Sequence, residues 1–414
     1  MKILFVPFTP SLAHITRCLS VAGTMKAENN DCLFAVGVEG KDFIEKAGFT
    51  VSIVPEITSE TFKNGRGWNW FTKKYFIDNL NAELKIIEEF NPDVIIYDFR
   101  FTSGLAARIK SKKSISIIHA SALSLILNPK ATASQIIAHE DLTLKKKFKE
   151  KIFQFIFPEV FIWFLRKPVK KIKPLLKQHH YTHINTVFDF LLGDLNLIAD
   201  TIDFIPAGLK VPENCHIVGP LLWSGWDGDN DFPLPGAETK PIIYITMGST
   251  IEAKSTILKL IGSIKDLPCN IIVSKGQTEF DPKELPENVF LYSRVPGNYV
   301  ASISSLVIYH GGHETLMQVL SCGTPSLVIP VNPDQILVAK QIKKLGIGNY
   351  LKAANNLPMD KEPLKHFTMI EIKNEVVKVL ENNQIKENCA KLKERLKKKA
   401  ESKEYINFIN SICQ

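Results

Sequence analysis

The sequence predicts an α/β protein with two doubly wound domains, each a parallel sheet covered by helices on both faces. Two observations carry this prediction. Short apolar runs alternate with helical patterns along the chain, and strands that are apolar throughout are typical of parallel sheets buried on both sides. The alternation also pauses near residue 220 and begins again near residue 240, after a segment rich in Gly, Pro and Asp, which indicates a linker between two domains.

The first domain is predicted over residues 1–220. It begins with an apolar strand at 2–7 that ends at a proline. A helix follows at 14–26, because Ile15, Cys18, Leu19 and Ala22 share one face. Later elements follow the same reasoning: strands at 33–38, 51–54, 94–97 and 116–120, and a helix at 104–110.

The second domain is predicted over residues 241–385, after a linker at 221–240. Its strands are expected at 242–246, 271–273, 289–292, 306–309 and 326–329, with helical patterns between them. The C-terminal stretch from about residue 371 to residue 414 is helical by period and carries lysines at its outward positions.

One insertion, at about residues 140–180, breaks the pattern. Between residues 145 and 177 eleven basic and two acidic residues surround the run IFQFIFPEVFIWFL, which is too short and interrupted to span a bilayer. It could lie on a membrane surface, cap a pocket for an apolar ligand, or form a core-facing helix with a solvated basic face. Composition alone favours the core-facing helix.

Overall composition excludes several classes of protein. The chain has 414 residues with 45% hydrophobic and 23% charged residues, as globular proteins do. The formal charge of +8 comes with no nucleic-acid-binding signature, so we expect no nucleic-acid partner. Seven cysteines without a C-x-x-C pair favour a reduced, cytoplasmic protein. The N-terminus MKILFVPFTP lacks the length and cleavage site of a signal peptide.

The stretch LVIYHGGHET, residues 306–315, allows two interpretations. A metal site would need His310 and His313 on one helix face, and the two intervening glycines oppose a helix. A strand that ends in Gly311-Gly312 and opens into a helix instead presents backbone N–H groups and the helix dipole to a phosphate. Asp334 follows the next strand at the same carboxyl edge, where such sheets bind ligands. We therefore expect an anion-binding site and no metal.

Four segments occur in an order that a known family shares. They are HGGHETLMQVLSCGTPSLVIPVNPDQ, Met247-Gly248-Ser249, Arg294-Val295-Pro296 and Ile217-Val218-Gly219-Pro220. With them, the chain resembles nucleotide-sugar glycosyltransferases of the GT-B fold, of the macrolide, flavonoid and glucuronosyl-type superfamily. The resemblance covers essentially the whole chain. It implies two facing Rossmann-like domains and a C-terminal helical segment, residues 386–414, that returns to the N-terminal domain.

The resemblance implies a donor site formed by Gly248, Ser249, Arg294, Val295, His310, Gly311, Gly312, Glu314, Thr315, Gln318, Asp334 and Gln335. His310 and its two glycines would contact the diphosphate, and Arg294 would stack on the base. Gln318 would bind the ribose, and Asp334 with Gln335 would bind the sugar hydroxyls. Ser249 and Thr315 would reach the phosphates.

Three of these positions depart from the family. Glu314 stands where Asn or Ser is usual, and a carboxylate repels a diphosphate unless it points away. Gln318 replaces a glutamate and would bond a hydroxyl more weakly than an ionised acceptor. Arg294 replaces a tryptophan that stacks on the base, although a guanidinium plane can also stack.

The resemblance also implies a catalytic pair in the first domain. His14 would act as general base, since imidazole takes a proton at neutral pH, and Asp98 would orient the ring. Asp98 could instead cap the helix that begins near Thr102. Ala13-His14 with Arg17 matches the family's arginine variant without its usual glycine, so we expect this loop to face the acceptor. His119, at another strand end, is a candidate acceptor-pocket residue.

The resulting hypothesis is an inverting, metal-independent hexosyltransferase. It would move a hexose from a UDP- or dTDP-sugar to a hydroxyl of an apolar acceptor, a natural product or lipid, with no cofactor beyond this co-substrate. Two alternatives remain open: a nucleotide-sugar 2-epimerase, and a non-catalytic sugar-nucleotide-binding partner. We expect a cytoplasmic protein, with peripheral contact to the inner membrane surface as an open alternative.

Overall fold

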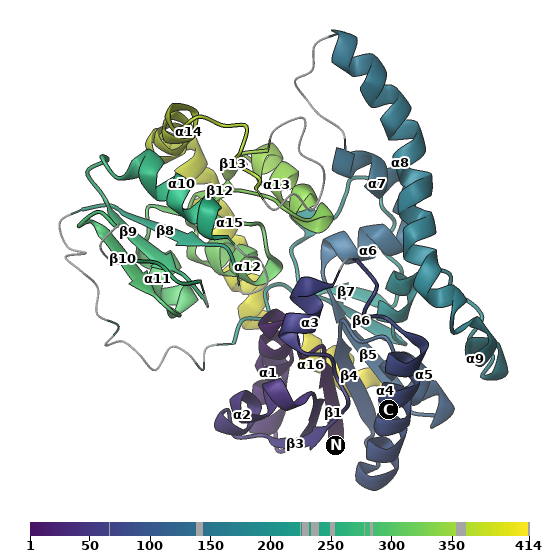
Figure 1. Ribbon diagram of the computed structural model, residues 1–414. Coiled ribbons are helices and arrows are strands. Elements are labelled where there is room, and N and C mark those ends of the chain that lie inside the picture. The colour runs from purple at the N-terminus through teal and green to yellow at the C-terminus, as the bar shows by residue number, and fades with distance from the viewer. Residues whose placement is uncertain are drawn as a thin grey trace. The chain divides into compact units, whose positions relative to one another are not determined.

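The chain forms two compact units, which are coloured by residue number in Figure 1. Unit 1 contains Met1–Trp223 and Ser402–Gln414, and unit 2 contains Ser224–Glu401. The computed structural model describes residues 1–65, 67–137, 144–223, 225, 232, 240–248, 253–276, 278–281, 285–352 and 362–412. Most of the predicted linker at 221–240 therefore lies outside the described residues.

Unit 1 is built on a seven-stranded parallel sheet with the order β3-β2-β1-β4-β5-β6-β7. The central strands are apolar and buried along their length, which is why they occupy the middle of a sheet covered on both faces. The strands are β1 (Lys2–Pro7), β2 (Asp31–Val36), β3 (Thr50–Ile53), β4 (Val94–Asp98), β5 (Lys113–Ile118), β6 (Leu195–Ile198) and β7 (Cys215–Ile217).

Helices cover both faces of this sheet, and each face has its own core. One core contains residues of α1 (Leu12–Ala27), α2 (Val38–Lys46) and α16 (Tyr405–Ile412). The other contains residues of α4 (Lys73–Phe90), α5 (Ser103–Ile109), α6 (Ala120–Leu127) and α8 (Leu144–Lys170). Shorter helices complete the unit: α3 (Ser59–Asn64), α7 (Pro129–Ile137) and α9 (Lys173–Gln178).

Unit 2 repeats the plan with a six-stranded parallel sheet of order β10-β9-β8-β11-β12-β13. Helices α10 and α14 share one core with the sheet. The strands are β8 (Ile242–Thr246), β9 (Asn270–Ser274), β10 (Val289–Tyr292), β11 (Leu306–Tyr309), β12 (Ser326–Val328) and β13 (Gly348–Tyr350). The helices are α10 (Lys254–Ile264), α11 (Gly297–Ile303), α12 (His313–Cys322), α13 (Pro333–Leu345), α14 (Met369–Glu381) and α15 (Asn383–Ser402).

The C-terminal helices divide between the two units. Helix α15 belongs to unit 2, where the Asn388 amide donates to the Gly346 carbonyl at 3.0 Å. Helix α16 belongs to unit 1, where the Tyr405 and Thr24 hydroxyls lie 2.9 Å apart and the Phe408 ring stacks on His216 at 3.9 Å. The predicted return to the N-terminal domain is confirmed. It begins at Ser402, whereas the sequence placed the returning segment at 386–414.

The predicted fold class is confirmed, because both units are parallel α/β sheets of the expected kind. The insertion forms the long helix α8, which keeps Pro158 and Pro168 within it. Its residues Ile162, Leu165 and Val169 are buried, as the core-facing alternative predicts. Among the residues described here, no helix combines the length and the apolarity that crossing a bilayer would require.

Candidate active site

Each sheet has one place where neighbouring strands lead their connections in opposite directions. In unit 1 this switch point lies between β1 and β4, and in unit 2 it lies between β8 and β11. Ligands bind at the carboxyl ends of the strands at such points, because the connections diverge there and leave room. His14 and Asp98 lie at the unit 1 switch point, whereas His119 follows the next strand, β5. Most donor candidates surround the switch point in unit 2.

His14 and Asp98 meet at the switch point of unit 1. His14 lies in the first turn of α1, and Asp98 ends β4, where it is in register with Pro7 of β1. The His14 Nδ1 atom lies 2.6 Å from Asp98 Oδ1, with the imidazole 14% exposed and the carboxylate buried. The alternative role of Asp98 as a helix cap is wrong, because Thr102 occupies the N-cap position of α5.

Arg17 is a third member of this group, although the sequence analysis assigns it no role beyond its place in the motif. Its side chain is 2% exposed. Its Nε donates to Asp98 Oδ2 at 2.7 Å, and its Nη2 donates to Oδ1 at 2.9 Å. Nη2 also lies 2.7 Å from His14 Nδ1, so the guanidinium and the imidazole share the same carboxylate oxygen.

The charge on Asp98 fixes the state of the His14 ring. Burial alone would raise the pKa of Asp98, but the neighbouring Arg17 and His14 lower it to about 2. Asp98 is therefore ionised at neutral pH and only accepts hydrogen bonds. The 2.6 Å contact with this acceptor assigns a ring proton to Nδ1, and the neutral form of the ring then has its lone pair on Nε2. That is the arrangement that a general base requires.

Aromatic side chains surround the base. The Phe99 ring stacks on His14 with centroids 4.9 Å apart and 11° between the planes. Phe99 has a φ of 52°, a left-handed conformation that bulky residues rarely adopt and that is common at functional sites. Phe8 contacts His14 edge-on at 5.9 Å, and it also packs against Phe62 and Trp70. Together with Trp68, which lies against Trp70, these four rings form what we call the aromatic cluster: Phe8, Phe62, Trp68, Trp70 and Phe99.

Replacement of Arg17 tests its role in positioning. We expect Arg17→Leu to lower kcat by about 100-fold, because a displaced base loses its alignment. The buried Asp98 would lose its largest stabilising charge, so its pKa would rise and the acidic limb of the pH–kcat profile would move to higher pH. Arg17→Lys keeps the positive charge, so its acidic limb should lie closer to the wild-type pH than the limb of Arg17→Leu does. The control is Arg108→Leu, which removes an arginine that stacks on Tyr181 and should leave the profile unchanged. If the pH profile of Arg17→Leu does not shift, Arg17 does not position the base.

In unit 2, the His310 ring is enclosed by glycine backbones. A Cβ atom on Gly248 would lie 2.6 Å from the ring Cε1, and one on Gly312 would lie 2.4 Å from Nε2. Gly311 has a φ of +89°, and a side chain there would also meet Val328 at 3.0 Å. Gly248 and Gly312 are therefore needed to make room for the histidine ring, and Gly311 is needed for its left-handed backbone conformation, in addition to any approach of a phosphate to the backbone.

Burial governs the charge of His310. It lowers the pKa of the ring to about 4, against a backbone hydrogen bond with Thr246 that acts in the opposite direction. The ring is therefore neutral at physiological pH and offers a hydrogen bond rather than a positive charge. Its Nδ1 atom is buried and has no hydrogen-bond partner among the described residues. A buried ring nitrogen of this kind is a feature that a bound ligand can satisfy.

The other donor candidates lie on α12 and on the loop after β10. Glu314, Thr315 and Gln318 share one partly exposed side of α12, and Glu314 lies in the helix's first turn, where the dipole favours a negative side chain. The Gln318 amide packs over Gly297, since a Cβ there would lie 2.7 Å from Oε1. Arg294 is exposed on the same loop, beside the half-buried Val295.

Asp334 and Gln335 begin helix α13 and differ in their availability. Gln335 is buried, and its Oε1 accepts hydrogen bonds from the backbone of Val331 and Asn332 at 2.9 Å. That oxygen is a helix cap, so a sugar hydroxyl could reach only the amide nitrogen. Asp334 is partly exposed, and burial raises the pKa of its carboxyl. Ser249 lies outside the described residues.

His119 has a structural role that the sequence did not suggest. It is the N-cap of α6, where its Nδ1 accepts a hydrogen bond from the Ala122 backbone at 3.3 Å and lies 2.7 Å from the Ser121 hydroxyl. Its position after β5 places it at the carboxyl edge of the unit 1 sheet. Within the described ranges, no group of three or more His, Cys, Asp or Glu side chains is arranged to hold a metal ion.

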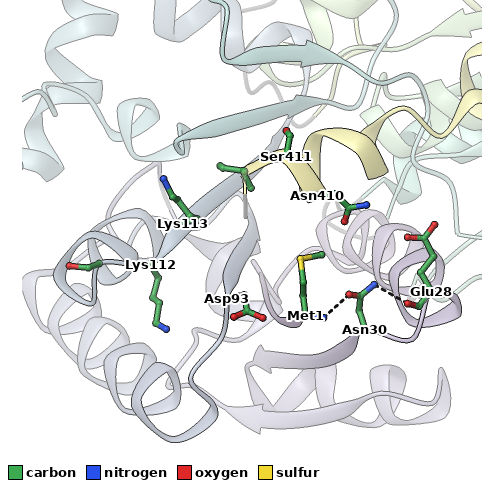
Figure 2. A pocket seen from close by; sticks show the side chains of 10 residues that line it. Met1, Glu28, Asn30, Asp93, Lys112, Lys113, Asn410 and Ser411 are labelled. Carbon is green, nitrogen blue, oxygen red and sulfur yellow. Dashed lines mark hydrogen bonds between the residues drawn. The ribbon is translucent and has the colours of Figure 1, made fainter. Parts of the chain in front are cut away.

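A large surface cavity of unit 1 is unrelated to these residues. It has a volume of about 1150 Å³ and is lined by residues such as Met1, Asp93 and Lys113, shown in Figure 2. These residues precede or begin β1, β4 and β5, so the cavity lies at the amino edge of the sheet, opposite His14. The Met1 amino group binds Asn30 at 3.0 Å. The cavity therefore plays no part in the candidate site.

Comparisons with known proteins show what the chain and its fold are similar to. Residues 258–409 match the family model of the erythromycin biosynthesis protein CIII-like C-terminal domain. The PGL/p-HBAD biosynthesis rhamnosyltransferase of Mycobacterium bovis is 25% identical over 370 residues, which cover 85% of this chain and 77% of that protein. The kitacinnamycin glycotransferase structure has a TM-score of 0.76 and 17% identity, covering 100% of this chain and 99% of the other. Spinosyn rhamnosyltransferase SpnG complexed with thymidine diphosphate has a TM-score of 0.63 and 15% identity, covering 96% of each chain.

Proposed function

We propose that the chain, which is a glycosyltransferase with the GT-B fold and of the macrolide and glucuronosyl type, transfers a hexose from a nucleotide sugar to a hydroxyl group of an apolar acceptor. The observation that carries this proposal is the contact of 2.6 Å between His14 and the buried carboxylate of Asp98. A histidine whose tautomer is fixed by an ionised aspartate can remove the proton of an alcohol at neutral pH.

The proposed reaction is a single displacement with inversion. His14 Nε2 takes the proton of the acceptor hydroxyl while the acceptor oxygen forms a bond to the anomeric carbon. The bond from that carbon to the donor phosphate oxygen breaks, and its electron pair leaves with the nucleoside diphosphate. Asp98 stabilises the imidazolium that forms, and Arg17 keeps Asp98 ionised and oriented. The products are the glycoside, the nucleoside diphosphate and a proton.

Unit 2 would stabilise the leaving diphosphate without a metal ion or other cofactor. Gly312 is the N-cap of α12 and its cap position carries no side-chain hydrogen bond, so the start of this helix directs its dipole and backbone donors at the ligand site. The neutral His310 would add one hydrogen bond. The raised pKa of Asp334 suits a side chain that bonds sugar hydroxyls rather than one that binds a cation.

The substrates follow from the surroundings of each half-site. The partly exposed rings of the aromatic cluster, Phe62, Trp68 and Phe99, favour an apolar acceptor, a natural product or a lipid, because flat rings pack well on such side chains. The donor is a UDP- or dTDP-hexose. The thymidine diphosphate bound by the spinosyn rhamnosyltransferase supports dTDP as the nucleotide. A cytoplasmic location is part of the proposal.

Release of the nucleoside diphosphate tests this function directly. The purified chain is supplied with UDP- and dTDP-hexoses, with and without a mixture of aromatic and aliphatic alcohols, and the diphosphate is measured. We expect release that depends on the acceptor, with a β-glycoside formed from an α-linked donor. Sugar isomerisation without acceptor would point to a 2-epimerase. Donor binding without turnover across the whole panel would point to a non-catalytic binder.

A further inference from the structure

The outward face of α8 carries an unusual concentration of exposed apolar side chains. Phe155 is 83% exposed, Val160 and Trp163 are each 54% exposed, and Ile156 is 51% exposed. Exposed single apolar residues are normal on protein surfaces, but a contiguous group marks an interaction site. Figure 1 shows α8 as the long teal helix of unit 1. These exposed side chains of α8 have no part in the proposed catalytic site.

These residues form one stripe that continues into basic residues. Ile156, Val160 and Trp163 follow each other at helical spacing of four and three residues, and Lys167 and Lys170 extend the same line. The Lys167 ammonium lies 5.7 Å from the centre of the Trp163 ring. Exposed basic residues then cluster at the C-terminal end: Arg166, Lys167, Lys170, Lys171 and Lys173.

The orientation of this stripe is fixed by the opposite side of the helix. Ile162, Leu165 and Val169 are 2–3% exposed, and Leu165 and Val169 belong to the core of unit 1. Rotation of α8 to bury Trp163 would expose these core residues. Glu159, the single acidic residue between 155 and 178 of the sequence, forms an ion pair with Lys130. The outward face therefore stays apolar and positively charged.

We propose that this face of α8 docks the enzyme on an anionic membrane surface. Apolar and aromatic side chains would enter the boundary between headgroups and acyl chains, where tryptophan is enriched in membrane proteins. The adjoining lysines would lie over the acidic headgroups of the cytoplasmic leaflet. Charge complementarity distinguishes this partner from a protein surface, since a cluster of five cations beside an exposed indole suits a sheet of lipid phosphates.

The docking face is also close to the aromatic cluster. Phe164 packs over Gly67, where a Cβ atom would lie 2.2 Å from the phenyl ring. Gly67 precedes Trp68, whose ring is 5.6 Å from Trp70. Membrane attachment through α8 would therefore hold the aromatic cluster, and the base beside it, near the surface in which an apolar alcohol dissolves.

Vesicle co-sedimentation tests the proposal on the full chain. The vesicles contain phosphatidylcholine alone or phosphatidylcholine with phosphatidylglycerol, at low and at high salt. The variants are Trp163→Ser, which removes the indole, and Lys170→Gln with Lys171→Gln, which removes two charges. Matched controls change equally exposed residues elsewhere: Ile202→Ser, at 60% exposure, and Lys85→Gln on α4, at 74% exposure.

We expect the wild type to bind the anionic vesicles at low salt and to dissociate at high salt. Each lysine neutralised should weaken the partition about fivefold, Trp163→Ser should weaken it about tenfold, and both controls should bind as the wild type does. Turnover of a water-soluble aromatic alcohol should not change, which separates this proposal from the proposed function. The proposal would be overturned if the wild type did not sediment with anionic vesicles. It would also be overturned if Trp163→Ser bound vesicles as the wild type does and only abolished a concentration-dependent dimer, because the face would then be an interface between two copies of the chain.

Discussion

Replacement of His14 by alanine should lower kcat by about a thousandfold, within the usual contribution of general base catalysis of about 10² to 10⁴. The variant removes the imidazole, and Asp98 remains paired with Nε and Nη2 of the Arg17 guanidinium. The buried carboxylate therefore stays compensated and the fold of unit 1 should persist. The measurement is the rate of nucleoside diphosphate release at saturating donor and acceptor.

Two further measurements separate loss of the base from loss of structure. Titration with UDP or dTDP should give the wild-type affinity, because the residues that would bind the diphosphate belong to unit 2. A control variant, His366→Ala, changes an exposed histidine away from both switch points and should leave the rate unchanged. If His14→Ala retains the rate within severalfold, a different residue accepts the proton. Partial rescue by added imidazole would strengthen the assignment.

The strands were the most predictable part of this chain, for a physical reason. Each central strand is buried on both faces, so its sequence is an apolar run that cannot be confused with a solvated loop. The strands at 2–7, 242–246, 289–292 and 306–309 were predicted with their observed ends. The short edge strands β7 and β13 were missed, and so was β6, a buried interior strand of only four residues. Three residues such as Gly348–Tyr350 hold their conformation through pairing with β12 rather than through local preference.

The candidate site also contains some residues that the sequence could identify and others that it could not. His14 and Asp98 were identifiable because each follows or ends an apolar strand, and carboxyl ends of neighbouring parallel strands meet at one edge. Arg17 gave a weaker signal, since its meaning depends on a carboxylate 81 positions away. The cap formed by Gln335 and the glycine enclosure of His310 depend on side-chain geometry. Sequence pattern alone carries no information about either.

A buried ion cluster was also invisible in the sequence. The amphipathic pattern of α4 places Asn79 and Glu83 on its buried side, where apolar residues are expected. In the structure both side chains bind the fully buried Arg100, whose Nε donates to Glu83 at 2.8 Å. Arg100 also pairs with Glu56, which accepts from the Tyr75 hydroxyl at 2.8 Å. The cluster anchors the backbone directly after Asp98 and Phe99.

Replacement of Arg100 by methionine should destabilise unit 1 by about 3–5 kcal/mol, because it leaves Glu56 and Glu83 buried without their cation. Urea unfolding followed by tryptophan fluorescence measures this change, since Trp68, Trp70, Trp163 and Trp223 all belong to unit 1. Arg108→Met, at an exposed site over the Tyr181 ring, is the matched control and should cost much less.

The pH dependence of the Arg100→Met deficit distinguishes lost charge pairing from lost packing. Burial already raises the pKa of Glu56, although Arg100 opposes this effect. Without the guanidinium, the folded-state pKa of Glu56 should rise further above its value in the unfolded chain. Stability from a raised pKa is complete below the unfolded-state pKa and is lost as the pH rises through the folded-state pKa.

The deficit of Arg100→Met should therefore be smaller near pH 5 than near pH 8, and Glu56→Gln in the same background should recover part of it at pH 8. A deficit that is constant with pH would mean that Arg100 acts through packing, and Asp98 and Phe99 would then owe their positions to the shape of the core alone.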